Sequence, residues 1–98
     1  MPQRNIERIR EKIRRRQYDM SKHAMEEMAE DLLDIADVES AVLNGQITRI
    51  ERSDPRGTKY VMEGTAADQK TPVTVVGRFA SSGRYVIITV YEVTDIEG

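Results

Sequence analysis

The sequence has no cysteine, no tryptophan and a single histidine in 98 residues. Without cysteine there are no disulfides, thiolate zinc sites, iron–sulfur clusters or cysteine nucleophiles. The aromatic residues are four Tyr and one Phe, so the core must be mainly aliphatic. The six glycines are scattered singly, and no phosphate-binding glycine loop is present.

Long hydrophobic runs are also missing. The longest, residues 85–90, is far shorter than the roughly 20 residues that cross a bilayer. No signal-peptide pattern opens the chain. We therefore expect a cytoplasmic protein with no membrane contact. The length fits one domain, and a hydrophobic content of 39% is enough for one modest core.

The formal net charge of −2 hides an uneven distribution. Residues 1–22 are basic, whereas residues 23–46 hold seven acidic residues and no Lys or Arg. One interpretation is that the basic head contacts nucleic acid or an acidic partner. The other is that the head and the acidic middle neutralise each other, or that the head is a solvated helix face. The second is the more ordinary one, because phosphate-binding domains are usually basic overall.

The basic head has the pattern of an amphipathic helix from residue 2 to about residue 16. Its apolar stripe is formed by Ile6, Ile9 and Ile13 at i, i+3, i+7. Three isoleucines make a thin stripe, so this helix needs a surface to pack on. That surface is the domain itself, a second copy or a partner. A partner contact or a homodimer through these isoleucines is therefore one hypothesis.

Two more helices are expected before residue 46. Ser21 is an N-cap for a helix from Lys22 to about Leu33, whose apolar stripe consists of Met25, Met28, Ala29 and Leu32. The opposite side carries His23, Glu26, Glu27 and Glu30. Asp34 begins the next helix with Asp37 in a capping box, and Asn44-Gly45 ends it.

The second half of the chain is strand-like. Residues 17–20 are expected to be an extended link, and four strands are expected at residues 46–52, 58–65, 72–79 and 85–93. Short links between strands favour antiparallel neighbours. The order of helices followed by strands predicts an α+β fold, with two to three helices packed on a four-stranded antiparallel sheet.

Several short motifs resemble a known family. Ser21-x-His23-Ala24, Met28-x-Glu30, Asp37-Val38, Ala41-x-x-Asn44-Gly45 and Ile88-Thr89-Val90-Tyr91 resemble domain-of-unknown-function family 4258, over residues 18–93. The resemblance implies a layout similar to the RelE/ParE-type toxins, in which helices pack on a curved antiparallel sheet. Some relatives in that superfamily cut messenger RNA, and some members are suspected toxins paired with a small antitoxin. Residues 1–17 lie outside it as a helical extension of a domain at 18–98.

The sequence departs from this family at one point. Many members carry Arg-Gly where this chain has Asp31-Leu32. A phosphate contact from that position is therefore not expected.

The resemblance implies candidate residues for RNA cleavage. His23, the only side chain expected to titrate near neutrality, is the candidate acid or base, with Arg78 and Tyr91 assisting it. Lys59 and Arg84, together with the head residues Arg14, Arg15 and Arg16, are candidate nucleic-acid contacts. The structural alternative is that His23 bonds a main-chain carbonyl and fixes the helix start. Arg78 and Arg84 would then be solvated charges, and Tyr91 a tyrosine at the edge of the core.

Ribonuclease chemistry of this kind needs an acid, a base and cations, but no cofactor. A metal is not expected either, because no second His or Cys accompanies His23. The leading hypothesis is a bacterial toxin-like protein that binds RNA or cuts it as a metal-independent endoribonuclease, with an antitoxin as partner. The rival is a non-catalytic protein-interaction domain that retains the fold, which the net acidity favours.

Overall fold

The computed structural model describes residues 2–93, which form three helices and five strands. The helices are α1 (Pro2–Arg14), α2 (Lys22–Glu30) and α3 (Ile35–Asn44). The strands are β1 (Tyr18–Met20), β2 (Gln46–Glu51), β3 (Lys59–Thr65), β4 (Pro72–Phe79) and β5 (Tyr85–Glu92). The α+β class is confirmed. No helix in the described part of the chain is long and apolar enough to cross a membrane.

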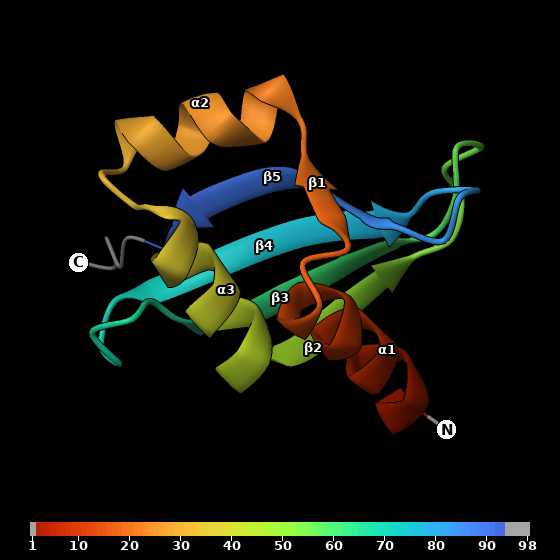
Figure 1. Ribbon diagram of the computed structural model, residues 1–98, viewed down its shortest axis with the longest axis horizontal. Helices are drawn as coiled ribbons and strands as arrows, with labels where there is room; N and C mark the ends of the chain where they lie inside the picture. The colour runs from red at the N-terminus through yellow and green to blue at the C-terminus, as the bar shows by residue number, and fades with distance from the viewer. Residues whose placement is uncertain (1, 94–98) are drawn as a thin grey trace.

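The five strands form one sheet in the order β1-β5-β4-β3-β2 (Figure 1). Strands β2 to β5 run antiparallel to their neighbours, as predicted. The expectation of a purely antiparallel, four-stranded sheet is wrong, because β1 adds to β5 in parallel, with Tyr18 opposite Tyr85. This strand is only three residues long, too short to show the alternation by which a strand is recognised.

The core lies between one face of the sheet and helices α1 and α3 (Figure 1). Ile6, Ile9 and Ile13 of α1 are 7%, 0% and 2% exposed, so the helix packs on its own domain. This arrangement does not support the hypothesis that these isoleucines bind a partner or form a dimer, since they are already covered. The other core members come from α3 and from alternate positions of the strands, including Val38, Val42, Met62, Val73, Val75, Tyr85, Ile87 and Val90.

The predicted helix caps are confirmed. The Ser21 side chain accepts a hydrogen bond from the backbone N–H of Ala24. Asp34 and Asp37 form the reciprocal capping box at the start of α3. Each such cap satisfies donors that the first helical turn leaves free, which stabilises the helix by about 1 kcal/mol.

Helix α2 lies along the edge of the sheet beside β5, rather than on its face (Figure 1). Its predicted apolar stripe is therefore rotated from the observed inner side, which consists of Ala24, Glu27, Met28 and Asp31. Met25 is 47% exposed and Leu32 91% exposed. The strand edge presents backbone N–H groups, which attract carboxylates, and this outweighs the burial of two apolar side chains.

The end of α2 also differs from the prediction. The helix stops at Glu30, with Asp31 as its C-cap. Leu32 then takes a left-handed conformation with φ of 58°. The N–H of Leu33 donates to Met28, and the N–H of Leu32 to Ala29. This is the Schellman pattern, in which the left-handed position is usually glycine.

Candidate nucleic-acid interface

No helix of residues 2–93 covers the face of the sheet opposite α1 and α3, which we call the open face. Side chains alternate along a strand, so positions next to the buried ones point to this open face. On β4, Val73 and Val75 are buried in the core, which places Thr74, Val76 and Arg78 on the open face. The register then places Val61, Glu63, Thr89 and Tyr91 beside them.

Arg78 and Tyr91 share this open face. Arg78 lies opposite Val86, and Tyr91 lies opposite Thr74. The two are therefore four positions apart along the sheet, about 13 Å at about 3.3 Å per residue. The structure brings them to one surface, but not to one reacting atom.

Arg78 is half-buried on the open face, which it shares with the half-buried Lys59, two positions from Val61 on β3. The stem of Arg78 lies beside Gly57 in the turn between β2 and β3. Among the described residues Arg78 has no ion pair and no side-chain hydrogen bond within 3.5 Å. Its guanidinium donors are therefore available to an acceptor such as a phosphate.

Tyr91 is 43% exposed at the far end of β5. Thr74, opposite it, is 1% exposed and its hydroxyl is buried without a partner. The exposed ring of Tyr91 offers a flat surface on which a nucleobase can stack.

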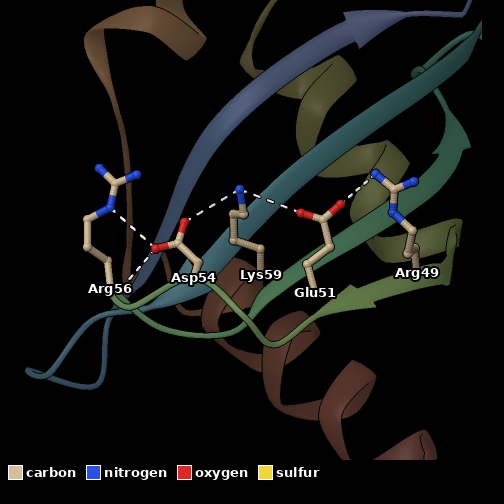
Figure 2. Close-up of polar contacts among 5 residues, drawn as sticks. All are labelled: Arg49, Glu51, Asp54, Arg56 and Lys59. Atoms are coloured by element: carbon tan, nitrogen blue, oxygen red, sulfur yellow. Dashed lines mark hydrogen bonds and ion pairs between the residues drawn. The ribbon is translucent and has the colours of Figure 1, made fainter.

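Lys59 belongs to a row of alternating charges at the β2–β3 turn (Figure 2). Its ammonium lies 3.5 Å from carboxylate oxygens of both Glu51 and Asp54. Arg49 pairs with Glu51 at 2.5 Å, and Arg56 pairs with Asp54 at 3.5 Å. These five residues neutralise one another in large part, so Lys59 is the weaker phosphate contact.

The Asp54 carboxylate also organises this turn. It accepts a hydrogen bond from the backbone N–H of Arg56 at 2.8 Å. That bond, followed by the side-chain contact and charge of Arg56, lowers the pKa of Asp54. The turn residues, with Pro55 and Lys59, border a shallow cavity of about 290 Å³. The paired charges therefore stabilise the turn and do not form an anion-binding site.

Arg84 is also occupied. Its guanidinium donates to both oxygens of Asp19, at 2.8 and 3.1 Å, and to the carbonyl of Tyr18 at 3.0 Å. The bond to Arg84 lowers the pKa of Asp19. Arg84 therefore holds β1 against the start of β5, a role that the sequence did not suggest.

The basic head residues lie at the end of α1. Arg14 and Arg15 both pair with Glu11, and Arg16 follows with a positive φ of 56°. Cations are favoured at a helix C-terminus by the exposed carbonyl groups. Arg14 and Arg15 are 52% and 65% exposed, so they can also meet a phosphate.

His23 stands at the first turn of α2, where its side chain is 65% exposed. Its Nε2 lies 3.2 Å from one oxygen of Glu27. The other Glu27 oxygen accepts a hydrogen bond from the backbone N–H of Val90 at 3.0 Å. The imidazole is thus exposed and held by a carboxylate that is itself fixed to β5.

Ser21, rather than His23, bonds main-chain carbonyls of the sheet and fixes the start of α2. Its N–H donates to the carbonyl of Ile87 at 2.9 Å, and its hydroxyl to that of Ile88 at 3.3 Å. The start of α2 is therefore fixed beside Ile87 and Ile88, between the levels of Arg78 and Tyr91 along β5. Within residues 2–93, no hydrogen bond or ion pair joins His23 to Arg78 or to Tyr91.

Glu27 and Asp31 are the contacts that sequence reasoning missed. Asp31 accepts a hydrogen bond from the N–H of Glu92 at 2.8 Å, as Glu27 does from Val90. Together they satisfy the part of the β5 edge that lies beyond β1, which protects it from pairing with another strand. Their i, i+4 spacing was visible, but the strand edge that they meet was not.

The described residues contain no group of three or more metal-ligating side chains. In the comparison with known families, residues 20–92 match the family described as "Domain of unknown function (DUF4258)". No curated protein and no solved structure matches the chain.

Proposed function

The chain belongs to the DUF4258 family, and from its geometry we propose that it is an RNA-binding module of the RelE-like toxin kind. The open face of the sheet contacts a single RNA strand. The observation that carries this proposal is the presence of Arg78 and Tyr91 on the face of the sheet that no helix of residues 2–93 covers. The proposal includes a cytoplasmic location, where messenger RNA would be met.

The chemistry of this face suits single-stranded RNA. Stacking of a base on an aromatic ring contributes about 1–3 kcal/mol, and cations beside it follow the phosphates. Arg78 offers donors to a phosphate, while Tyr91 offers a ring about 13 Å farther along the sheet. Arg14, Arg15 and Arg16 supply further positive charge at the end of α1.

The topology also supports the RelE-like proposal. Strands β2 to β5 form a continuous antiparallel unit with helices on one face. Helices on an antiparallel sheet are the part of this layout that agrees with what the resemblance to RelE/ParE-type toxins implies, and the parallel strand β1 is a difference. In such a system an antitoxin protein is the expected partner.

RNA cleavage is the second candidate, and the exposed pair of His23 and Glu27 favours it. In metal-independent cleavage a base removes the 2′-hydroxyl proton, the 2′-oxygen attacks phosphorus, and an acid protonates the leaving 5′-oxygen. His23 is the one imidazole available. Because His23 lies at the edge of the sheet beside β5, a bound RNA must pass from the open face over that edge to reach the imidazole.

Binding is tested by fluorescence anisotropy with a labelled single-stranded RNA. We expect Arg78→Ala and Tyr91→Ala each to weaken binding roughly tenfold or more, and Tyr91→Phe to retain it because the ring remains. Arg52→Ala removes a charge just beyond β2 at the opposite edge and is the matched control. Affinity should fall steeply with salt. Equal binding by Arg78→Ala, Tyr91→Ala and the wild type would overturn the proposal.

Cleavage is tested on the same RNA in the presence of a chelator. We expect products ending in a 2′,3′-cyclic phosphate, and their loss in a folded His23→Ala variant. Expression in a bacterium should arrest growth, and the same substitution should relieve the arrest. RNA binding without cleavage would leave a binding module. Absence of both binding and cleavage would favour the rival, a protein-interaction domain.

A further inference from the structure

Helix α2 presents an apolar stripe to solvent. Met25 is 47% exposed, Ala29 is exposed one turn later, and Leu32, two residues past the end of the helix, is 91% exposed. Ile35, the first residue of α3, is also 42% exposed. We call Met25, Ala29 and Leu32 the outer stripe. A helix that packs on its own domain normally turns such a stripe inward.

The fold does not explain Leu32. Its φ of 58° lies in the left-handed region, which side chains with a Cβ rarely adopt. Glycine would occupy this position without strain and would expose no apolar surface. A leucine there is unfavourable on both counts for the isolated chain.

The surroundings of the outer stripe are negative. Glu26, Glu30 and Asp34 are exposed beside it, and none of them has an ion-pair partner in the part of the chain that the structure describes. No Lys or Arg occurs anywhere from residue 23 to residue 46. An apolar stripe flanked by uncompensated carboxylates complements an element with apolar and basic faces.

We propose that the outer stripe of α2 docks a basic amphipathic segment of another protein. Apolar side chains of that segment cover Met25 and Leu32, and its Lys or Arg side chains meet Glu26, Glu30 and Asp34. A second copy of this chain does not supply such a segment through α1, because the isoleucines of α1 are buried in its own core. This inference does not depend on RNA binding by the open face.

The first test uses synthetic peptides and fluorescence anisotropy on the whole protein. The probe is a Leu/Lys peptide with leucines at i, i+3, i+4 and i+7, compared with a scrambled peptide and with a Leu/Glu version of it. We expect the Leu/Lys peptide alone to bind, with an affinity that falls as salt is added. Equal binding of the Leu/Glu or the scrambled peptide would overturn the proposal.

The second test locates the binding surface. The variant Met25→Gln/Leu32→Gln should weaken peptide binding about tenfold or more, because it removes the apolar contact but keeps the charges. Leu43→Gln is the matched control, since Leu43 is 38% exposed on α3 outside the outer stripe. Retained binding by the double variant would contradict the proposal. So would dimerisation of the protein alone in sedimentation, if Leu32→Gln abolished it, because the occupant would then be a second copy.

Discussion

Helices α1 and α2 are both amphipathic, but only α1 buries its whole apolar stripe, whereas α2 buries Ala24 and part of Met28 and leaves the rest of its stripe exposed. Helix α1 buries Ile6, Ile9 and Ile13 and exposes charged residues such as Glu7 and Arg14. Helix α2 turns Glu27 and Asp31 inward and leaves Met25 and Leu32 in solvent. The difference follows from what each helix faces. Helix α1 packs against α3 and β5, whereas α2 lies along a strand edge whose N–H groups have no partner strand and donate to Glu27 and Asp31.

This comparison shows that a hydrophobic stripe predicts the buried side of a helix only where the neighbouring surface is apolar. At a strand edge, an unpaired buried N–H costs about 1–3 kcal/mol, so a carboxylate that accepts from it can decide how the helix is turned. Met25 and Leu32 then remain exposed, and we have proposed that a partner covers them.

The largest expected effect tests the ordinary helix. Ile9 is fully buried, and Ile9→Ala should lower the free energy of unfolding by about 2–5 kcal/mol through lost burial and a cavity. Urea denaturation measures it. Leu32→Ala, at the exposed stripe of α2, is the control and should change stability by no more than about 0.5 kcal/mol. A loss below 1 kcal/mol for Ile9→Ala would mean that α1 is not docked.

The contact of α2 with the edge of β5 is tested at Glu27. Glu27→Ala leaves the N–H of Val90 without its acceptor and should destabilise the fold by about 1–3 kcal/mol. Hydrogen exchange of the Val90 amide should accelerate in the same variant. Glu26→Ala removes an exposed carboxylate one position earlier and should change neither measurement. Equal effects of the two substitutions would show that α2 does not protect the β5 edge through Glu27.

A smaller effect is expected at Leu32, with the opposite sign. Leu32→Gly should stabilise the fold by about 0.5–1 kcal/mol, because relief of the left-handed strain, about 1–2 kcal/mol, exceeds the added flexibility of the unfolded chain, about 0.4–1 kcal/mol. Thermal unfolding should show a higher midpoint. Destabilisation would indicate that the Leu32 side chain contributes to the fold and is not free for a partner.

The smallest effect concerns a carboxylate that caps a loop rather than an edge. The Asp68 carboxylate accepts hydrogen bonds from the Thr71 side chain, from the Thr71 N–H and from the Lys70 N–H, which lower its pKa from 3.8 to about 2. Because the folded pKa is depressed, its stabilising contribution is present above pH 4 and is lost as the pH falls toward 2.

An NMR titration of Asp68 measures this pKa directly. Thr71→Val removes the hydroxyl and should raise it toward 3.8, while Thr58→Val should leave it unchanged. An unshifted pKa in the wild type would contradict the loop geometry.

Much of the fold could be predicted because local signals are strong. The caps at Ser21 and Asp34, the stripe of α1 and the four antiparallel strands each depend on neighbours in sequence. Strand β1 could not be predicted, because it is stabilised by pairing with β5, which lies 67 residues farther along the chain at the Tyr18–Tyr85 pair. The inner side of α2 was missed for the same reason.

The candidate site was predictable only in part. Alternation placed Arg78 and Tyr91 each on one side of its strand, but the register that puts both on the open face is a property of the assembled sheet. The sequence also could not show that Lys59 and Arg84 are paired with carboxylates. Those pairs join residues from different strands, or from a strand and a turn, and alter which cations remain available.

Whether the open face is the surface that meets RNA can be measured by an NMR titration of the isotope-labelled protein with a single-stranded RNA. We expect the amide shifts to concentrate at Arg78, Tyr91 and their neighbours on β4 and β5, and to reverse on addition of salt. Shifts confined to α2, or no shifts at low salt, would contradict this expectation.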